Sequence, residues 1–157
     1  MDALSSLQNE IDQGRFNQLS SQNCALAKNY KLIFDTPAGQ SRYSYAKIIS
    51  NKVLALSIFA MAQPISGLVC FNIGYAVSRS SRGQNLGVEA VSIGISELEV
   101  GLKRNNLKEF YIEAVVEETN YYSIVVANKI FGNTGNKIVD ASSGKPAFAF
   151  QKIINIR

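Results

Sequence analysis

The sequence predicts one α/β domain, in which helices pack against a mixed, mostly antiparallel sheet. The chain has 157 residues and is 46% apolar, which suits a single domain with its own core. Strand-like runs follow one another in the first half, and strands alternate with helical patterns in the second half. No segment has the composition of a linker, so residues 1–157 are expected to form one domain.

The N-terminal part of the chain is expected to be helical. Leu4, Leu7 and Ile11 recur at helical spacing. A second helix is predicted over Phe16 to Lys28, where several apolar residues can form one face. A short strand over Asn29 to Asp35 should follow it.

Three strands with turn signals between them are predicted next. Runs of apolar and β-branched residues are separated by short segments rich in Asn, Pro, Ser and Gly. Such spacing is typical of an antiparallel meander. The strands are expected over Tyr43–Ser50, Val53–Ala62 and Leu68–Val77, with turns at Asn51–Lys52 and Gln63–Gly67.

The second half of the sequence alternates between helix and strand. Apolar residues recur every three or four positions over Gln84 to Arg104, which predicts a long helix. A strand over Tyr111–Val116 and a helix over Asn120–Ile130 should follow. Two final strands are expected over Lys137–Ala141 and Ala147–Ile156.

Composition excludes several classes of function. The chain has no histidine, which removes Ser-His-Asp hydrolysis, Cys-His nucleophiles and His-ligated metals. Its two cysteines form no CxxC pattern, so no metal site is expected. The net charge of +4 comes without a run of Lys or Arg, which argues against nucleic acid. The apolar run Val53–Ala62 is too short to span a bilayer and no signal peptide is visible, so a cytoplasmic protein that does not bind membranes is expected.

One turn carries the clearest functional signal. The stretch Ser78 to Ala90, SRSSRGQNLGVEA, lies between a predicted strand and the long predicted helix. A glycine-containing turn that leads into a helix points several unpaired N–H groups and the positive end of the helix dipole at one place. A phosphate group suits such a site, and Arg79 and Arg82 add positive charge. Neither the Walker A pattern nor GxGxxG is present, so the type of phosphate ligand stays open at this point.

Two segments together resemble the GNAT acyltransferase superfamily. VSRSSRGQNLG, residues 77–87, is similar to the family's pyrophosphate-binding motif, and NYYSIVVANKIFG, residues 120–132, is similar to its second cofactor-binding helix. The resemblance extends over about residues 43–156, including the order of elements. It implies that residues 43–156 form the core that binds acetyl-CoA and that residues 1–29 lie on the acceptor side.

The resemblance also implies which residues bind acetyl-CoA. The pantetheine arm should enter between two splayed strands, the pyrophosphate should lie on the turn, and the second motif helix should contact the arm. The residues expected to bind the cofactor are Tyr75, Ala76, Val77, Arg79, Arg82, Gly83, Gln84, Asn85, Leu86, Gly87, Val88, Asn120 and Ser123.

The sequence departs from the family pattern at four places. Asn85 replaces the middle glycine of the motif, and Phe131-Gly132 inverts the usual Gly-Phe. Ala127 stands where many members have the tyrosine that protonates the departing thiolate. Val115 stands where members that acetylate protein N-termini have a glutamate base. The resemblance therefore supports cofactor binding better than it supports any catalytic residue.

In the family a bound primary amine attacks the thioester directly, within a ternary complex. An amine must lose a proton to react, and without histidine the candidates are carboxylates, or tyrosine acting through water. Glu113 and Glu117 flank Val115 on a predicted strand and share its face. Tyr122 begins the second motif helix and could replace the missing tyrosine. These three residues are the candidate catalytic groups.

Two other functions remain open at this stage. The chain could bind acyl-CoA without catalysis, as a sensor or a structural ligand, and Ala127 and Val115 favour that reading. It could instead be a nucleotide-binding or scaffolding domain that only shares the turn. The acceptor could be a small amine, an aminoglycoside or a peptide amine. A homodimer is also possible, since the apolar segment AFAFQKIINI, residues 147–156, could pair across subunits.

Overall fold

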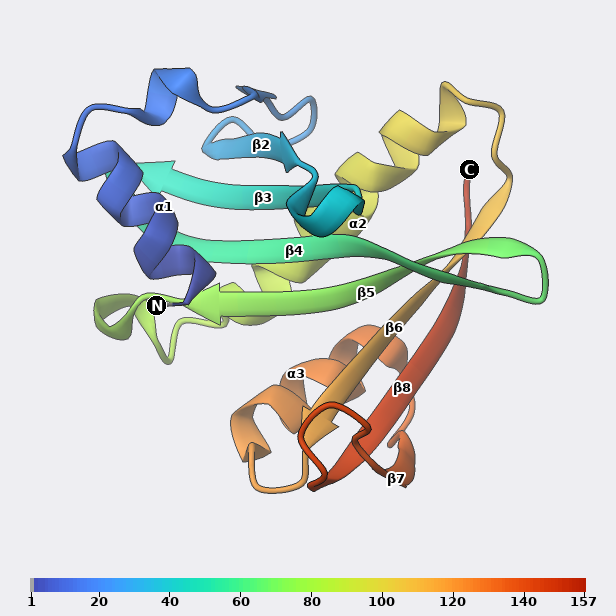
Figure 1. The fold of residues 1–157 in the computed structure, drawn as a ribbon. Helices are drawn as coiled ribbons and strands as arrows, with labels where there is room; N and C mark the ends of the chain where they lie inside the picture. The colour runs from blue at the N-terminus through green and yellow to red at the C-terminus, as the bar shows by residue number, and fades with distance from the viewer. Residues whose placement is uncertain (1) are drawn as a thin grey trace.

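The computed structural model describes residues 2–157 and shows one eight-stranded sheet with helices on both faces (Figure 1). The sheet order is β1-β2-β3-β4-β5-β6-β8-β7, and every neighbouring pair is antiparallel except β5 and β6. The expected mixed, mostly antiparallel sheet flanked by helices is therefore confirmed. No helix within the described residues is long and apolar enough to cross a membrane.

The elements follow the predicted order from the first long strand onward. The helices are α1 (Ala3–Asp12), α2 (Leu86–Lys103) and α3 (Tyr121–Phe131). The strands are β1 (Ser21–Asn23), β2 (Tyr30–Asp35), β3 (Arg42–Ile49), β4 (Lys52–Ile65), β5 (Leu68–Val77), β6 (Glu109–Glu117), β7 (Asn136–Val139) and β8 (Pro146–Asn155).

The predicted meander is present as β3, β4 and β5. Its first turn lies one residue earlier than expected: Ser50 and Asn51 have φ of 49° and 62°, and Lys52 already belongs to β4. Two consecutive positive φ values match the right-handed twist of a hairpin, and Asn tolerates them well. Strand β4 also continues through Pro64, which lies at an irregularity in the register between Ala62 and Ile65.

The expected second helix over Phe16 to Lys28 is wrong. This segment forms a single 3-10 turn over Phe16–Gln18 and then the short strand β1. Strand β1 pairs antiparallel with β2, where Ser21 lies opposite Ile33. Pairing with the edge of β2 satisfies the backbone N–H and C=O groups of this segment. Ser21 and Asn23 have low helix propensity, so a helix here would be weak.

Two apolar cores cover the two faces of the sheet. On one face α1 packs its buried Leu7 against β2, β3 and β4, where Ile33, Ala46, Val53 and Leu56 are buried. On the other face α2 and α3 cover the larger core, which includes Phe59, Phe71, Phe110, Phe131 and Phe150. Burial of these large rings on one face and of aliphatic side chains on the other fixes the sheet between its helices.

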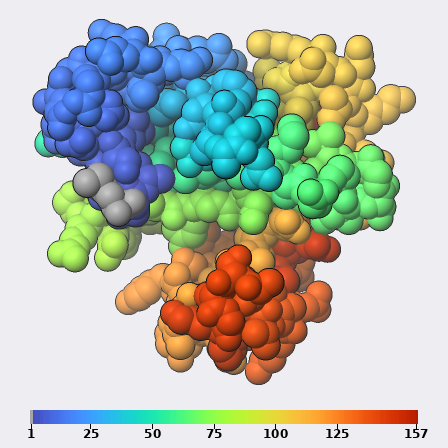
Figure 2. Space-filling model, in the orientation of Figure 1, coloured from blue at the N-terminus to red at the C-terminus, as the bar shows by residue number. Residues whose placement is uncertain are grey.

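The sheet divides into two parts where the parallel pair occurs. Strands β1 to β5 form one part, and β6, β8 and β7 form the other, which diverges from β5 (Figure 1). With α3, the second part forms a lobe below the rest of the molecule, drawn in orange and red (Figure 2). The junction of the two parts is the place where a ligand could enter the sheet.

Candidate active site

The site is built on a parallel strand pair that separates halfway along its length. Cys70, Phe71 and Asn72 of β5 pair with Tyr111, Ile112 and Glu113 of β6. Beyond Asn72 and Glu113, no pairing joins the two strands within residues 2–157. From there each strand keeps only its outer partner, β4 for β5 and β8 for β6. The facing backbone edges are therefore available to an extended ligand.

A cavity of about 300 Å³ occupies this opening. Its walls come from the ends of β5 and β6, from α3 and from one residue of α2. Most of the lining is apolar, with a few polar groups at the rim, which is the usual chemistry of a small-ligand site. The lining residues are Ile73, Gly74, Tyr75, Val91, Ala114, Val115, Val116, Glu117, Asn120, Ser123, Val126, Ala127, Ile130 and Phe131.

Tyr75 and Ser123 meet across the opening. The Tyr75 hydroxyl lies 3.1 Å from Ser123 Oγ, so it joins β5 to α3 by a hydrogen bond. Gly87 makes this position of the ring possible, because a Cβ on Gly87 would lie 2.7 Å from Tyr75 Cε2. The glycine of the motif therefore serves the packing of Tyr75 as well as the start of the helix.

The turn before α2 leaves a row of N–H groups free. Asn85 precedes the helix in the left-handed conformation, with φ of 60°, and its side chain does not cap the helix. Gly83 has φ of 77°. Within residues 2–157 no protein group accepts a hydrogen bond from the N–H groups of residues 83–88, and the first intrahelical bond is Glu89 N–H to Asn85 O at 3.2 Å. A phosphate group suits this set of donors.

Arginine side chains add positive charge beside these N–H groups. Arg79 and Arg82 are exposed, and neither forms an ion pair with another residue of the described chain. Two hydrogen bonds fix the start of the turn. The Ser78 N–H donates to Leu54 O at 2.9 Å, and Ser78 Oγ donates to Ser81 Oγ at 2.9 Å. An anion at this turn would meet fixed donors and two mobile cations.

Comparison with solved structures identifies the fold. The chain is similar to an acetyltransferase of the GNAT family from Streptococcus pneumoniae, with a TM-score of 0.54 and 12% identity, over 72% of this chain and 67% of that one. It is also similar to RimL, a ribosomal L7/L12 α-N-protein acetyltransferase in complex with coenzyme A, with a TM-score of 0.54 and 17% identity, over 74% of this chain and 64% of that one. The chain has the GNAT fold. A ribosomal-protein-S5-alanine acetyltransferase from Vibrio fischeri has the same fold, with a TM-score of 0.53 and 17% identity, over 73% of this chain and 61% of that one.

The likeness lies in the fold and not in the overall sequence. No protein-family profile and no curated protein sequence matches the chain. The chain spans about two thirds of the length of the GNAT structures that it matches, between 61% and 67% for these three.

The residues expected to bind the cofactor fall into three groups around the opening. Tyr75, Ala76 and Val77 end β5 beyond its pairing with β6, and Tyr75 lines the cavity. Arg79 to Val88 form the turn and the start of α2, where Leu86 and Gly87 are buried and residues 82–85 are exposed. Asn120 and Ser123 line the cavity from the start of α3, and Asn120 caps the helix by accepting from Ser123 N–H at 3.2 Å.

The three candidate catalytic residues have different positions. Glu117 lines the cavity, and its carboxylate lies 3.4 Å from Lys145 Nζ. Glu113 is not among the lining residues, but it faces Gln151, whose Nε2 donates to Glu113 Oε2 at 3.3 Å. Tyr122 is 88% exposed and lies outside the cavity. Tyr122 therefore lies near the start of α3 on the side of the helix that faces solvent.

Several lining residues could not be recognised from the sequence. Ala114, Ala127 and Phe131 are buried and form the inner wall of the cavity, but their apolar character makes them look like ordinary core residues. The signal that could have found them is the second motif itself, because Ala127 lies one helical turn after Ser123 on the same face of α3. Ala127 leaves space where a larger side chain would reduce the cavity.

Proposed function

We propose that this protein is an acetyl-CoA-dependent N-acetyltransferase that acts on a primary amine. The proposal rests on two neighbouring features of the structure that together suit one extended ligand. Free N–H groups at the start of α2 suit a pyrophosphate, and the opening between β5 and β6 next to them suits an extended arm. The RimL structure, whose fold this chain shares, is a complex with coenzyme A.

Each part of the proposed cofactor has residues suited to it. The N–H groups of residues 83–88, with Arg79 and Arg82, would hold the pyrophosphate. The free edge of β5 from Tyr75 to Val77 would hold the pantetheine arm, and Asn120 and Ser123 would contact it from α3. Acetyl-CoA supplies an acetyl thioester, which an amine can attack directly. The protein then has to orient the amine, remove its proton and return a proton to the leaving thiolate.

We propose two carboxylates as candidates to accept the proton of the amine. Glu117 lies in the cavity wall, and Glu113 lies four residues earlier on the same face of β6. Because β6 ends at Glu117, this carboxylate lies at the open end of the strand pair, whereas Glu113 belongs to the last residue pair between β5 and β6. We assign Glu117 as the first candidate for the base and Glu113 as the second, with a water molecule as the intermediary.

Tyr75 is the candidate for the group that protonates the thiolate. Ala127 has no proton to give, and Tyr122 lies outside the cavity. The hydroxyl groups that line the cavity within the described chain belong to Tyr75 and Ser123, which are hydrogen-bonded to each other. A pair of this kind can pass a proton, because Ser123 can supply Tyr75 as Tyr75 donates.

The alternative function is binding of acyl-CoA without catalysis, as a sensor or a structural ligand. Its support is the apolar character of two positions: Ala127 is buried in the cavity wall and Val115 is 45% exposed on β6. In members of the family that the sequence resembles, these two positions carry catalytic side chains. This alternative keeps the same cofactor site and differs only in turnover.

The amine is expected to belong to a small molecule or a peptide. RimL and the S5-alanine enzyme act on ribosomal proteins, as their descriptions state. A cytoplasmic location agrees with a supply of acetyl-CoA. Homodimer formation through residues 147–156 is a further proposal, although β7 already pairs with the first part of β8, at residues 146–149. Only the later part of that strand edge is open to a second subunit, and light scattering after size exclusion would test this.

Ligand-dependent thermal stability tests the cofactor first. Acetyl-CoA and CoA at about 100 times their Kd should stabilise the protein by about 2.7 kcal/mol, or about 5–11 °C in Tm, while ATP and NAD should not. Release of free thiol with a panel of amines and peptides then separates the two functions. Turnover supports the enzyme, binding without turnover supports the alternative, and no binding contradicts both.

A further inference from the structure

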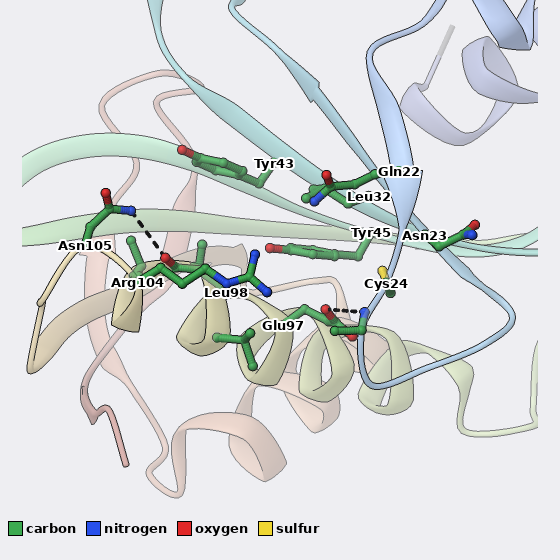
Figure 3. A pocket seen from close by; sticks show the side chains of 14 residues that line it. Gln22, Asn23, Cys24, Leu32, Tyr43, Tyr45, Glu97, Leu98, Arg104 and Asn105 are labelled. Carbon is green, nitrogen blue, oxygen red and sulfur yellow. Dashed lines mark hydrogen bonds between the residues drawn. The ribbon is translucent and has the colours of Figure 1, made fainter.

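A second cavity is separate from the opening between β5 and β6. It has a volume of about 380 Å³ and lies between the segment around β1, the strands β2 and β3, and the C-terminal half of α2 (Figure 3). No residue lines both cavities. The volume is within the range of about 300–1,000 Å³ that is typical of small-ligand sites.

The hydroxyl group of Tyr45 has no partner in this cavity. The Tyr45 side chain is only 2% exposed and lines the cavity from β3, yet its hydroxyl forms no hydrogen bond with any residue in the described chain. The hydroxyl lines the cavity and is not fully enclosed by protein atoms, so a ligand in the cavity can form a hydrogen bond with it. Burial raises the pKa of Tyr45 well above its ordinary value, so the hydroxyl stays protonated and can donate to a ligand.

Glu97 of α2 and Arg104, which directly follows α2, give the cavity opposite charges at its two ends. Glu97 and Arg104 are seven positions apart, so they lie on the same face of the helix and about 10.5 Å apart along its axis. In Figure 3 the Arg104 side chain runs inward along the helix toward Tyr45, and Glu97 lies at the other end beside Cys24. Arg104 forms no ion pair with any carboxylate of residues 2–157.

The Glu97 carboxylate is held in place but is not saturated. Its side chain accepts hydrogen bonds from the N–H groups of Ala25, at 3.0 Å, and of Leu26. A carboxylate has about four acceptor positions, so a cationic group in the cavity can still bind it. Between Glu97 and Arg104 the wall is apolar, with Leu32, Leu98 and Leu102.

We infer that this cavity binds a free amino acid with an apolar side chain. The ammonium group would bind Glu97, the carboxylate would bind Arg104 and the Tyr45 hydroxyl, and the side chain would lie against the leucines. A ligand with only one charge would contact only one of these two charged groups, whereas an amino acid would contact both. Because no residue lines both this cavity and the acetyl-CoA opening, the amino acid is an effector or a structural ligand and not the acceptor.

Calorimetry with matched ligands tests this inference. The standard amino acids are titrated into the protein, and L-leucine is compared with 4-methylpentanoate, which lacks the amine, and with 3-methylbutylamine, which lacks the carboxylate. We expect an apolar amino acid to bind, and each single-charge analogue to bind weaker by about tenfold or more, the loss of one charged hydrogen-bonded contact. Absence of binding by every amino acid, or equal binding of leucine and an analogue, overturns the inference.

Two variants locate the site. Tyr45→Phe removes the hydroxyl and keeps the ring, and Arg104→Gln changes an exposed residue just after α2, so both should fold. Each should weaken amino-acid binding by about tenfold or more. Binding of CoA should be unchanged in both, which separates this inference from the proposed function. Unchanged amino-acid affinity in the two variants would place the ligand elsewhere and overturn the assignment.

Discussion

Tyr75 of β5 and Ser123 of α3 form a hydrogen bond of 3.1 Å across the opening between β5 and β6. This bond is the polar link between the two parts of the sheet at the proposed cofactor arm. The two residues are 48 positions apart in the sequence, and neither carries a recognisable catalytic pattern. In the proposed function, Tyr75 of β5 donates the proton that Ala127 of α3 cannot supply.

Replacement of Tyr75 by Phe should therefore impair the chemical step. We expect Tyr75→Phe to lower kcat for acetyl transfer by about 10²-fold, the usual contribution of a general acid, with a much smaller change in KM for acetyl-CoA. The matched control is Tyr122→Phe, whose hydroxyl is on a side chain that is 88% exposed, and it should keep its activity. Equal kcat values for the two variants would remove Tyr75 from the mechanism.

The turn at Gly83 offers a test of the phosphate site. Gly83→Asp adds a negative charge beside the free N–H groups, so we expect the Kd for CoA to rise by more than about tenfold. Gly83 has φ of 77° with open space around it, so any side chain there is strained but not in contact with other atoms. Gly83→Asn carries the same strain without the charge and should lose much less affinity. Similar affinities of both variants would show that the pyrophosphate binds elsewhere.

Much of the fold could be predicted because local pattern and tertiary structure agree. In β3 to β5 the turns fall where Asn, Pro, Ser and Gly interrupt apolar runs, and α2 has both the apolar periodicity and the basic C-terminus of a helix. The segment over residues 16–28 could not be predicted in this way. Its structure depends on the edge of β2 and on Glu97, which is more than 70 positions away and binds the N–H groups of Ala25 and Leu26.

The candidate site was predictable only in part, for a similar reason. The turn from Arg79 to Val88 is continuous in sequence, so its glycines and arginines could be read directly. The cavity depends on where β5 and β6 stop pairing, which is after Asn72 and Glu113. Neither residue has a sequence signal that would predict the end of the pairing. Tyr122 was expected in the site because it begins α3, but rotation of the helix about its axis directs Ser123 and Ala127 to the cavity instead.

Close packing of α2 on β4 should make Gly94 sensitive to substitution. A Cβ at Gly94 would lie 2.4 Å from Phe59 Cε2 and 2.7 Å from Ser57 Oγ, and Ser57 Oγ donates a buried hydrogen bond of 2.8 Å to Ala90 O. We expect Gly94→Ala to lower the free energy of unfolding by about 1–3 kcal/mol, because neither the ring nor the bonded hydroxyl can move freely.

Gly101 in the same helix provides the matched control. A Cβ there would have no neighbour within 4 Å, so Gly101→Ala should raise the free energy of unfolding by about 0.5–1 kcal/mol through helix propensity alone. Urea denaturation of both variants measures the difference. Stability changes of the same sign in the two would contradict the packing of α2 on β4 described above.

The ion pair between Lys47 and Glu89 should make stability depend on pH in the acidic range. Lys47 Nζ lies 2.7 Å from Glu89 Oε1, and this hydrogen bond is the main cause that lowers the pKa of the Glu89 carboxyl, with a smaller contribution from the Tyr30 hydroxyl at 3.0 Å. A carboxyl whose pKa is lower in the folded state contributes stability above its unfolded value, about 4.3, and loses it as the pH falls through the lowered folded value.

Glu89→Gln should therefore differ most from the original protein at neutral pH. We expect the difference in urea midpoint to be constant above about pH 5 and to shrink steadily as the pH falls below about 4.3. The effect should be modest, because the Glu89 side chain is 40% exposed and solvent screens the pair. In a Lys47→Met background the pH-dependent part should be smaller still. A difference that stays the same from pH 7 to pH 3 would show that Glu89 supports α2 through packing and not through its charge.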